Sequence, residues 1–254
     1  LGRSLALPCP TLPGASRPDQ TQRSSGRQPL RSGNEPSKVW MVYPGRPLSV
    51  NGWPQTMTPY RQIRADFDRD SIVVYQAYRS EIAEPAVREG RFVQPFSWGR
   101  MTWIKPSFLW LMARSGWAQK SGQERILSVR ISRAGWDRAL SLGVLTSFHP
   151  EVHADPDDWR SRFDEAAVHV QWDPERSIHG KKQEHRSIQV GLSRRIIREF
   201  TDQWVHEIKD LTPLTRKLRG LCLSGNHRRA KDLLPPERVY PVPPQTARNL
   251  GIEP

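Results

Sequence analysis

All ten tryptophans of the 254-residue chain lie between Trp40 and Trp204, and this distribution restricts where a hydrophobic core can form. Residues 1–38 contain no aromatic side chain and are rich in Pro, Ser, Gly, Arg and Gln. Such a segment buries too little apolar surface to offset the entropy that is lost when it is ordered. We therefore expect a disordered leader over residues 1–38 and a globular domain that begins near residue 39.

The chain is strongly basic, with a formal net charge of +13, but the charge is distributed unevenly. Residues 1–38 hold six Lys or Arg against two acids, and residues 213–254 hold eight against three. The flanks thus carry +4 and +5, which leaves +4 for residues 39–212. We expect a globular domain over residues 39–212 and a basic, proline-rich C-terminal extension over residues 213–254. Basic tails of this kind keep nucleic acid open as a partner.

Both cysteines, Cys9 and Cys222, lie in these flanks, so we expect neither a disulfide framework nor a cysteine metal site. The segment His149–His153, HPEVH, differs from the zinc-binding helix motif because Pro150 separates the first histidine from the acid. We predict no bound metal. No apolar run of the sequence is long enough to cross a bilayer, and we expect a soluble, cytoplasmic protein without a membrane partner.

Short strand-like and helix-like segments alternate through the middle of the chain. Alternating or β-branched apolar residues predict strands at 71–78, 124–132, 167–173 and 186–193. Capping residues and helical apolar spacing predict helices at 80–90, 106–116, 134–142 and 193–208. This order predicts an α/β (α+β) domain with a single mixed sheet and disordered basic tails. The glycine-rich turn of a dinucleotide fold or P-loop is missing.

Residues 100–117, RMTWIKPSFLWLMARSGW, combine three tryptophans with three cationic side chains. Pro106 is expected to start a helix, which puts Trp110 in the core. Trp103 and Trp117, at the two ends of that helix, suit packing and ligand stacking equally well. The helix N-terminus, with Ser107 in its first turn, is a potential phosphate site through its free N–H groups and its dipole. The residues predicted to bind a phosphorylated, ring-containing ligand are Tyr78, Arg100, Thr102, Trp103, Lys105, Ser107 and Arg186.

Four further residues are candidates for catalysis: Gln76, Arg79, Glu124 and Gln189. Gln76 and Arg79 lie where the strand 71–78 meets a helix, a position that often carries ligand groups in α/β proteins. Glu124 or Gln189 would position a ribose of the ligand. Surface ion pairs are the alternative for two of these residues, between Arg79 and a nearby glutamate and between Glu124 and its neighbour Arg125.

Three stretches of the sequence resemble the signature of a known family, the domain of unknown function numbered 4291. They are VYQAYRSEIAEPAVREGRF, RMTWIKPSFLWLMARSGWAQKSGQERIL, and VQWDPERS together with RSIQVGLS. The resemblance covers about residues 39–212. It implies the limits of the globular domain but no reaction, because no activity is assigned to that family.

A second resemblance, at the level of the fold, is to ADP-ribosyltransferases. The first strand of those enzymes has an aromatic residue, then His or Arg, then a small residue, and a short helix that ends in Gly-x-Phe follows. Tyr75–Ala77 and Gly90–Phe92 match this shape. Gln76 stands at the position of the His or Arg, and Gln189 lies on the last strand, where those enzymes carry a glutamate. The resemblance implies NAD as the cofactor.

Two functions therefore remain open at this point. The first is a nucleotide-handling enzyme, of the ADP-ribosyltransferase type, that binds NAD or another phosphorylated ligand at a cleft lined by Trp, Arg and Lys. The alternative is a non-catalytic protein that binds single-stranded nucleic acid through tryptophan stacking and its basic tails. A domain that only binds a protein partner, with every tryptophan in the core, fits the sequence as well.

Overall fold

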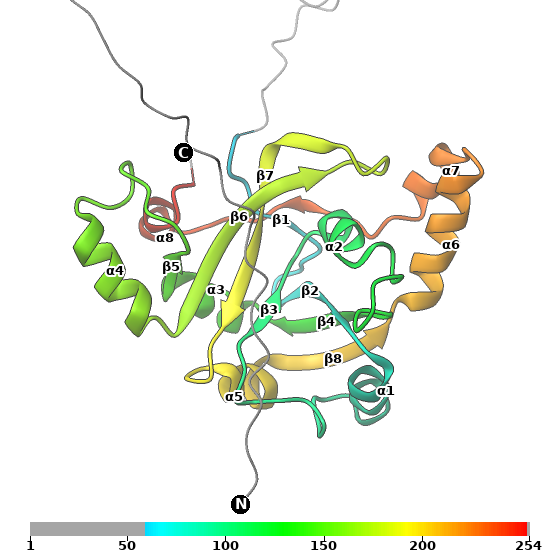
Figure 1. Cartoon of the computed structure of the whole chain (residues 1–254), viewed down its shortest axis with the longest axis horizontal. Coiled ribbons are helices and arrows are strands. Elements are labelled where there is room, and N and C mark those ends of the chain that lie inside the picture. Colours follow the sequence, from blue (N-terminus) through cyan, green and yellow to red (C-terminus); the bar gives the residue numbers. More distant parts are fainter. Residues whose placement is uncertain (1–58, 253–254) are drawn as a thin grey trace, which may run out of the picture. The chain divides into compact units, whose positions relative to one another are not determined.

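Two crossed β-sheets form the framework of the molecule (Figure 1). The computed structural model describes residues 59–252, so the leader predicted for residues 1–38 lies outside the described residues. One sheet contains β2 (Ser71–Tyr78), β4 (Arg125–Ser132) and β8 (Val205–Asp210), with β4 in the centre. Its neighbouring strands are antiparallel.

The second sheet has four strands, in the order β3 (Thr102–Ile104), β7 (Lys182–Leu192), β6 (Val168–Arg176) and β5 (Gly143–Leu145). Its pairs are antiparallel except for β5 and β6, which are parallel. A short ladder joins β1 (Arg64–Ala65) to β9 (Arg238–Val239). The mixed α/β class is confirmed, and the strands are divided among these sheets instead of forming one.

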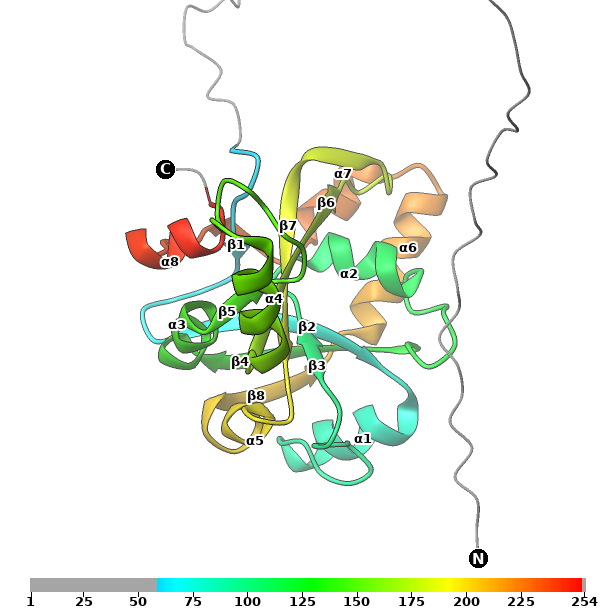
Figure 2. The same cartoon turned by 60° about the vertical axis from the view of Figure 1, so that its left-hand side comes forward.

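Helices pack against both sheets (Figure 2). The helices are α1 (Ser80–Glu89), α2 (Phe108–Ser115), α3 (Arg133–Ser141), α4 (Pro156–Glu165), α5 (Ile197–Glu199), α6 (Thr212–Leu223), α7 (His227–Asp232) and α8 (Pro244–Asn249). A π-helical turn, η1 (Phe200–Trp204), follows α5. Because α2 and α6 lie on one side of the β2–β4–β8 sheet and α1 lies on the other, this sheet is buried on both faces.

The sequence of β2 accounts for this double burial. Ile72 and Val74 point into the main core between the two sheets, together with apolar residues of β4, β6 and β7. Val73 and Tyr75, on the opposite face, pack with α2 and α6 in a second core cluster. Since side chains alternate along a strand, a continuous apolar run is required wherever both faces are covered. The strand predicted at 71–78 is confirmed with the same bounds.

The helix predicted for residues 193–208 is confirmed only for residues 197–204, and its C-terminal part is wrong. Residues Ile197–Glu199 form one helical turn, η1 follows, and the chain then continues as β8, which pairs with the edge of β4. The apolar spacing was ambiguous, because Trp204 and Ile208 can share a helix face and can also be buried separately, one in a turn and one in a strand. Pairing with β4 decides the outcome, since tertiary contacts override local helical preference.

The segment after residue 212 is folded onto the domain, although the sequence suggests an extension. It forms α6, α7, β9 and α8, and Leu218, Ala230, Tyr240 and Leu250 are each at most 2% exposed. The prolines that suggest a tail instead begin helices, because a proline in the first turn of a helix loses no hydrogen bond. Residue 212 is therefore not a domain boundary in the structure.

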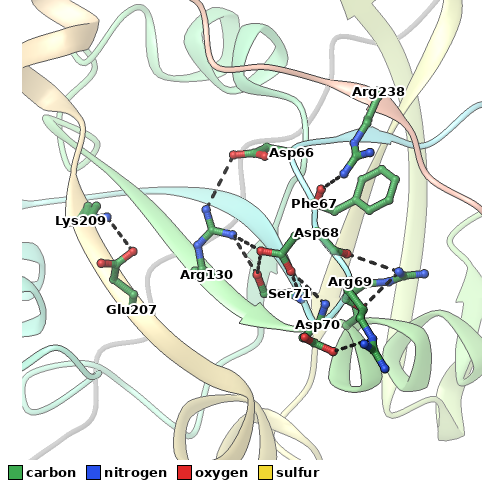
Figure 3. Close-up of polar contacts among 11 residues, drawn as sticks. Asp66, Phe67, Asp68, Arg69, Asp70, Ser71, Arg130, Glu207, Lys209 and Arg238 are labelled. Atoms are coloured by element: carbon green, nitrogen blue, oxygen red, sulfur yellow. Dashed lines mark hydrogen bonds and ion pairs between the residues drawn. The ribbon is translucent and has the colours of Figure 1, made fainter.

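The turn that precedes β2 ties this C-terminal segment to the first sheet (Figure 3). The Asp68 carboxylate accepts hydrogen bonds from the backbone N–H groups of Asp70 and Ser71, at 2.9 and 2.7 Å. Arg130 of β4 donates to Asp68 at 3.3 Å and to the Ser71 hydroxyl at 2.8 Å. Arg238 of β9 donates to the carbonyl oxygen of Phe67. Residues that are far apart in the sequence thus hold one turn.

The N-terminus of α2 is also satisfied by groups from within the chain. The Ser107 side chain accepts a hydrogen bond from Trp110 N at 3.2 Å, and the Glu237 carboxylate accepts one from Phe108 N at 2.9 Å. Burial raises the pKa of Glu237 to about 7, although the bond from Phe108 opposes this rise. The predicted phosphate site at this helix end is therefore occupied by a carboxylate of the protein.

A matched pair of glycine substitutions tests how closely α3 and η1 pack. A Cβ atom at Gly135 would lie 2.4 Å from the Trp204 ring, so Gly135→Ala should destabilise the fold by about 1–3 kcal/mol. In α6, nothing lies within 4 Å of a Cβ atom at Gly220, so Gly220→Ala should stabilise the fold by about 0.5–1 kcal/mol. Urea unfolding measures the change in stability for each variant. Equal effects of the two substitutions would contradict the close packing of α3 on η1.

Glu237→Gln tests the buried carboxylate at the start of α2. Between pH 4.5 and 7 the folded chain retains a proton on Glu237 that the unfolded chain releases, so this group lowers stability as the pH rises through that window. Glutamine keeps an oxygen for Phe108 N without the charge. We expect Glu237→Gln to match the wild type near pH 4.5 and to be more stable by about 1–2 kcal/mol at pH 8. Urea unfolding midpoints at both pH values measure the difference in stability between the variant and the wild type. A difference that is the same at both pH values would contradict the prediction.

Candidate functional site

The two sheets are joined by an isolated pair of residues and diverge beyond it. Tyr75 N donates to Lys105 O at 2.6 Å, and Lys105 N donates to Tyr75 O at 3.3 Å. Past this joint, the end of β2 and the strands β6 and β7 enclose a cavity of about 740 Å³, and α2 forms part of its wall. Polar groups outweigh apolar ones in the lining, which is typical of a site for a charged ligand.

The structure brings most of the predicted site residues to this cavity. Its lining includes Gln76, Tyr78, Arg100, Thr102, Trp103, Lys105 and Gln189. Two of them come from β2, four from the segment through β3, and one from β7. The convergence follows from the topology, since β3 pairs with β7 while Lys105, the residue directly after β3, bridges to Tyr75 of β2.

One end of the cavity carries a compact hydrogen-bonded cluster. The Gln76 side-chain nitrogen donates to Thr102 Oγ1 at 2.7 Å and lies 2.9 Å from Tyr78 Oη and 3.2 Å from Trp103 O. The Trp103 carbonyl can only accept, so the amide nitrogen must face it. The Gln76 side-chain oxygen is then left buried without a partner among the described residues. Burial also raises the pKa of Tyr78 above its usual range, so its hydroxyl stays protonated.

Lys105 is the buried cation of the cavity, and its side chain is 9% exposed. Its ammonium donates to Trp103 O at 3.0 Å and lies 5.7 Å from the centre of the Trp110 ring. Burial is the main cause that lowers the pKa of Lys105 to about 7, with a smaller effect of the Arg114 guanidinium and an opposing effect of Asp173. At neutral pH a large fraction of Lys105 is therefore an uncharged amine.

The opposite wall is built from one face of β6 and β7. The two oxygens of the Asp173 carboxylate accept hydrogen bonds from Gln171 at 2.9 Å and from Gln189 at 2.7 Å. All three side chains line the cavity. The two amides fix the orientation of the carboxylate, and their own oxygens remain as acceptors for a ligand.

Trp103 lies across a glycine of the neighbouring strand. It pairs with Gly191 of β7, and a Cβ atom at Gly191 would come within 3.0 Å of the Trp103 ring and 2.8 Å of Met101 Sδ. Glycine at this position therefore allows the ring to lie close to the sheet and beside the cavity. Trp103 is half-buried, so one part of the ring can contact a ligand.

Exposed cations and aromatic rings surround the mouth of the cavity. The exposed Arg100, two residues before β3, and the exposed Arg114 of α2 line it, and the ring of Trp110 also contributes. Two smaller cavities share residues with it and extend it. One of about 400 Å³ continues to Arg79, and one of about 510 Å³ continues to Arg176. The result is an elongated groove with arginines along its length.

Four predicted residues lie outside the main cavity. Arg79 lines only the adjoining one and forms an exposed ion pair with Glu81 at 3.7 Å. Ser107 is 2% exposed and caps α2. Glu124 accepts a hydrogen bond from Gly122 N at 2.7 Å. Arg186 donates to Tyr60 Oη at 2.8 Å and lines a separate cavity.

The sequence reasoning missed several lining residues, among them Trp110, Arg114, Gln171 and Asp173. Trp110 and Arg114 are four residues apart, which puts them on one face of α2, and Gln171 and Asp173 are two apart, which puts them on one face of β6. These spacings were signals in the sequence. Trp117, whose role was open, packs into the second core cluster.

Residues 59–252 contain neither a metal-binding cluster nor a membrane-spanning helix. In that part of the chain, no group of three or more His, Cys, Asp or Glu side chains is placed to hold a metal ion. Within the same range, every helix is too short or too polar to cross a bilayer. His149 and His153 of the HPEVH segment contact each other through the His149 backbone.

Comparison with known proteins identifies the family. No curated protein matches the sequence. The sequence model of a protein family, described as a domain of unknown function (DUF4291), matches residues 62–240. The match spans both sheets and the whole cavity, and it extends past residue 212 into α6, α7 and β9. The chain therefore belongs to the DUF4291 family.

Proposed function

We propose that this protein is a nucleotide-handling enzyme that binds NAD or another phosphorylated ligand in the cavity between its sheets. The observation that carries the proposal is the convergence of Trp103, Arg100, Lys105 and Gln76 on one cavity. Flat aromatic faces suit a base, and guanidinium groups suit phosphate oxygens. An activity of the ADP-ribosyltransferase type is part of this proposal and rests on the sequence resemblance.

The charge of the lining supports an anionic ligand. Arg100, Lys105 and Arg114 face a single carboxylate, Asp173, which is already hydrogen-bonded to two amides. Arg100 and Arg114 are exposed, so their guanidinium groups are free to reach phosphates at the mouth. The adjoining cavities favour an elongated molecule such as a dinucleotide over a single small anion.

The polar groups inside the cavity suggest roles in handling the ligand. The Gln76 side-chain oxygen, buried without a partner among the described residues, would accept a hydrogen bond from a ligand N–H or hydroxyl. Gln189 and Gln171 present amide oxygens from the other wall and would position a ribose hydroxyl. Cytoplasmic location is likewise part of the proposal.

Binding of single-stranded nucleic acid is the second candidate. One observation favours it: the basic residues after position 212 lie on the folded helices α6 and α7, where Arg216, Lys217, Arg228 and Arg229 form part of the surface. A basic surface next to a tryptophan-lined groove is suited to a strand of nucleic acid. Removing the segment after residue 212 would not test this, because that segment contributes to the core.

Calorimetric titration with NAD, ADP-ribose and ATP tests the first candidate. We expect binding by the wild type and a loss of about tenfold or more in affinity for Arg100→Ala combined with Arg114→Ala, since each lost phosphate contact costs about 1.5–3 kcal/mol. Arg216→Ala combined with Lys217→Ala, an equal change of charge on exposed α6, should leave the affinity unchanged. The absence of heat with every nucleotide would remove the proposal.

The same titrations, repeated with an oligo-dT strand, separate the two candidates. A nucleotide-binding enzyme should lose affinity for nucleotides only when the cavity arginines are replaced. A nucleic-acid binder should instead bind the oligonucleotide more weakly after Arg216→Ala combined with Lys217→Ala, with an affinity that falls steeply as salt is added.

Gly191→Ala tests the role of the Trp103 ring without changing any polar group. The added methyl group would lie 2.8 Å from Met101 Sδ and 3.0 Å from two atoms of the Trp103 ring, so Met101 must shift and the ring must move by a few tenths of an ångström. We expect nucleotide affinity to fall about tenfold, since a stacked base is worth about 1–3 kcal/mol. Gly99→Ala is the control, because its Cβ atom would meet only the Ser97 hydroxyl, at 4.0 Å. Unchanged affinity in Gly191→Ala would contradict stacking on Trp103.

A further inference from the structure

Lys105 occupies a position that packing alone does not explain. Its side chain is buried, and within residues 59–252 its ammonium makes one hydrogen bond, to Trp103 O, and no ion pair. A buried ammonium without a carboxylate partner destabilises a fold, and an apolar side chain of similar length would avoid this cost. Lys105 thus places an amine at the wall of the cavity, although burying it lowers the stability of the fold.

The groups around Lys105 favour its uncharged form. The Arg114 guanidinium of α2, which lines the same cavity, disfavours a second positive charge on Lys105. Asp173 of β6 has the opposite effect, but both of its oxygens already accept hydrogen bonds from amides. Lysines become nucleophilic when they are desolvated and lie near another cation, and both conditions are met here.

The amine is also accessible to a ligand. Lys105 lines the cavity, and Trp103 O accepts hydrogen bonds from both Lys105 and Gln76, at 3.0 and 3.2 Å. The Lys105 nitrogen therefore lies within about 6 Å of the Gln76 amide, whose oxygen lacks a partner among the described residues. A ligand bound by Gln76 would have its reactive end next to the amine.

We propose that Lys105 is a nucleophilic amine that forms an imine with the carbonyl group of a phosphorylated aldehyde or reducing sugar bound in the cavity. This inference rests on the proposed function, because the phosphate of the ligand is held by the same Arg100 and Arg114 at the mouth. It adds a covalent step and a chemical class of ligand to that proposal.

The covalent step requires no further reagent. The lone pair of the Lys105 nitrogen forms a bond to the carbonyl carbon, and the C=O π electrons move to oxygen. One amine proton is transferred to that oxygen, which gives a carbinolamine. The hydroxyl group then leaves as water with the second amine proton, and a C=N bond remains. The neutral amine is the reactive form, and burial favours that form by lowering the pKa of Lys105 to about 7.

Reductive trapping with pyridoxal 5′-phosphate tests the inference, since this probe is a phosphorylated aromatic aldehyde. The full chain is incubated with the probe at pH 7.5 and reduced with borohydride, and the modified lysine is located by peptide mass spectrometry. We expect Lys105 to be modified at least about tenfold faster than Lys120, which is exposed and lies outside the cavity. Prior addition of a nucleotide that binds in the cavity should slow the modification of Lys105 by the probe.

Variants and a second probe make the outcomes distinct. Lys105→Met should abolish the fast modification and Lys120→Met should not, with circular dichroism confirming that both are folded. Pyridoxal, which lacks the phosphate, should modify Lys105 about fivefold more slowly, and this difference should vanish in Arg100→Ala combined with Arg114→Ala. Modification of Lys105 no faster than that of Lys120 overturns the inference.

The result also separates this inference from the proposed function. If nucleotides bind but Lys105 is not trapped, the imine is refuted while the nucleotide site stands. If Lys105 is trapped equally well by both aldehydes and no nucleotide binds, the amine is reactive but the phosphate-binding role of the arginines is refuted, and the inference as stated fails with it.

Discussion

The reciprocal hydrogen bonds between Tyr75 and Lys105 are the constraint on which the rest of the structure depends. They join the two sheets at one residue pair, at 2.6 and 3.3 Å, and the strands diverge beyond it. On one side of the joint, the Tyr75 ring packs edge-on against Phe108 at the start of α2, which anchors the helix. On the other side, polar side chains face the gap between the sheets and form the cavity.

The C-terminal segment fills a backbone site, at the N-terminus of α2, that would otherwise be free to bind an anionic ligand. Glu237 accepts the free N–H of Phe108 at the N-terminus of α2, so the most obvious anion site of the sequence is already filled. In the proposed function, a phosphate is therefore held by side chains at the mouth of the cavity. This is why Arg100 and Arg114, and not the helix dipole, carry the proposed ligand contacts.

The sequence predicts the elements whose signals are local. Alternation and capping identified the strands at 71–78 and 124–132 and the helix at 106–116, and the mixture of Trp, Arg and Lys at residues 100–105 pointed to the cavity. It did not predict features that depend on distant partners. Strand β8 exists because β4 offers it an edge, and Asp173 enters the site only because β6 pairs with β7.

The cavity's single carboxylate explains why its buried amine can remain unpaired. Each oxygen of Asp173 is directed toward an amide, from Gln171 and from Gln189, within the β6–β7 sheet. A carboxylate held in this way lowers the free energy of a charged Lys105 only through a longer-range attraction, which is too weak to offset burial. Within the described residues, Lys105 therefore stays a buried amine whose one hydrogen bond goes to a backbone carbonyl oxygen.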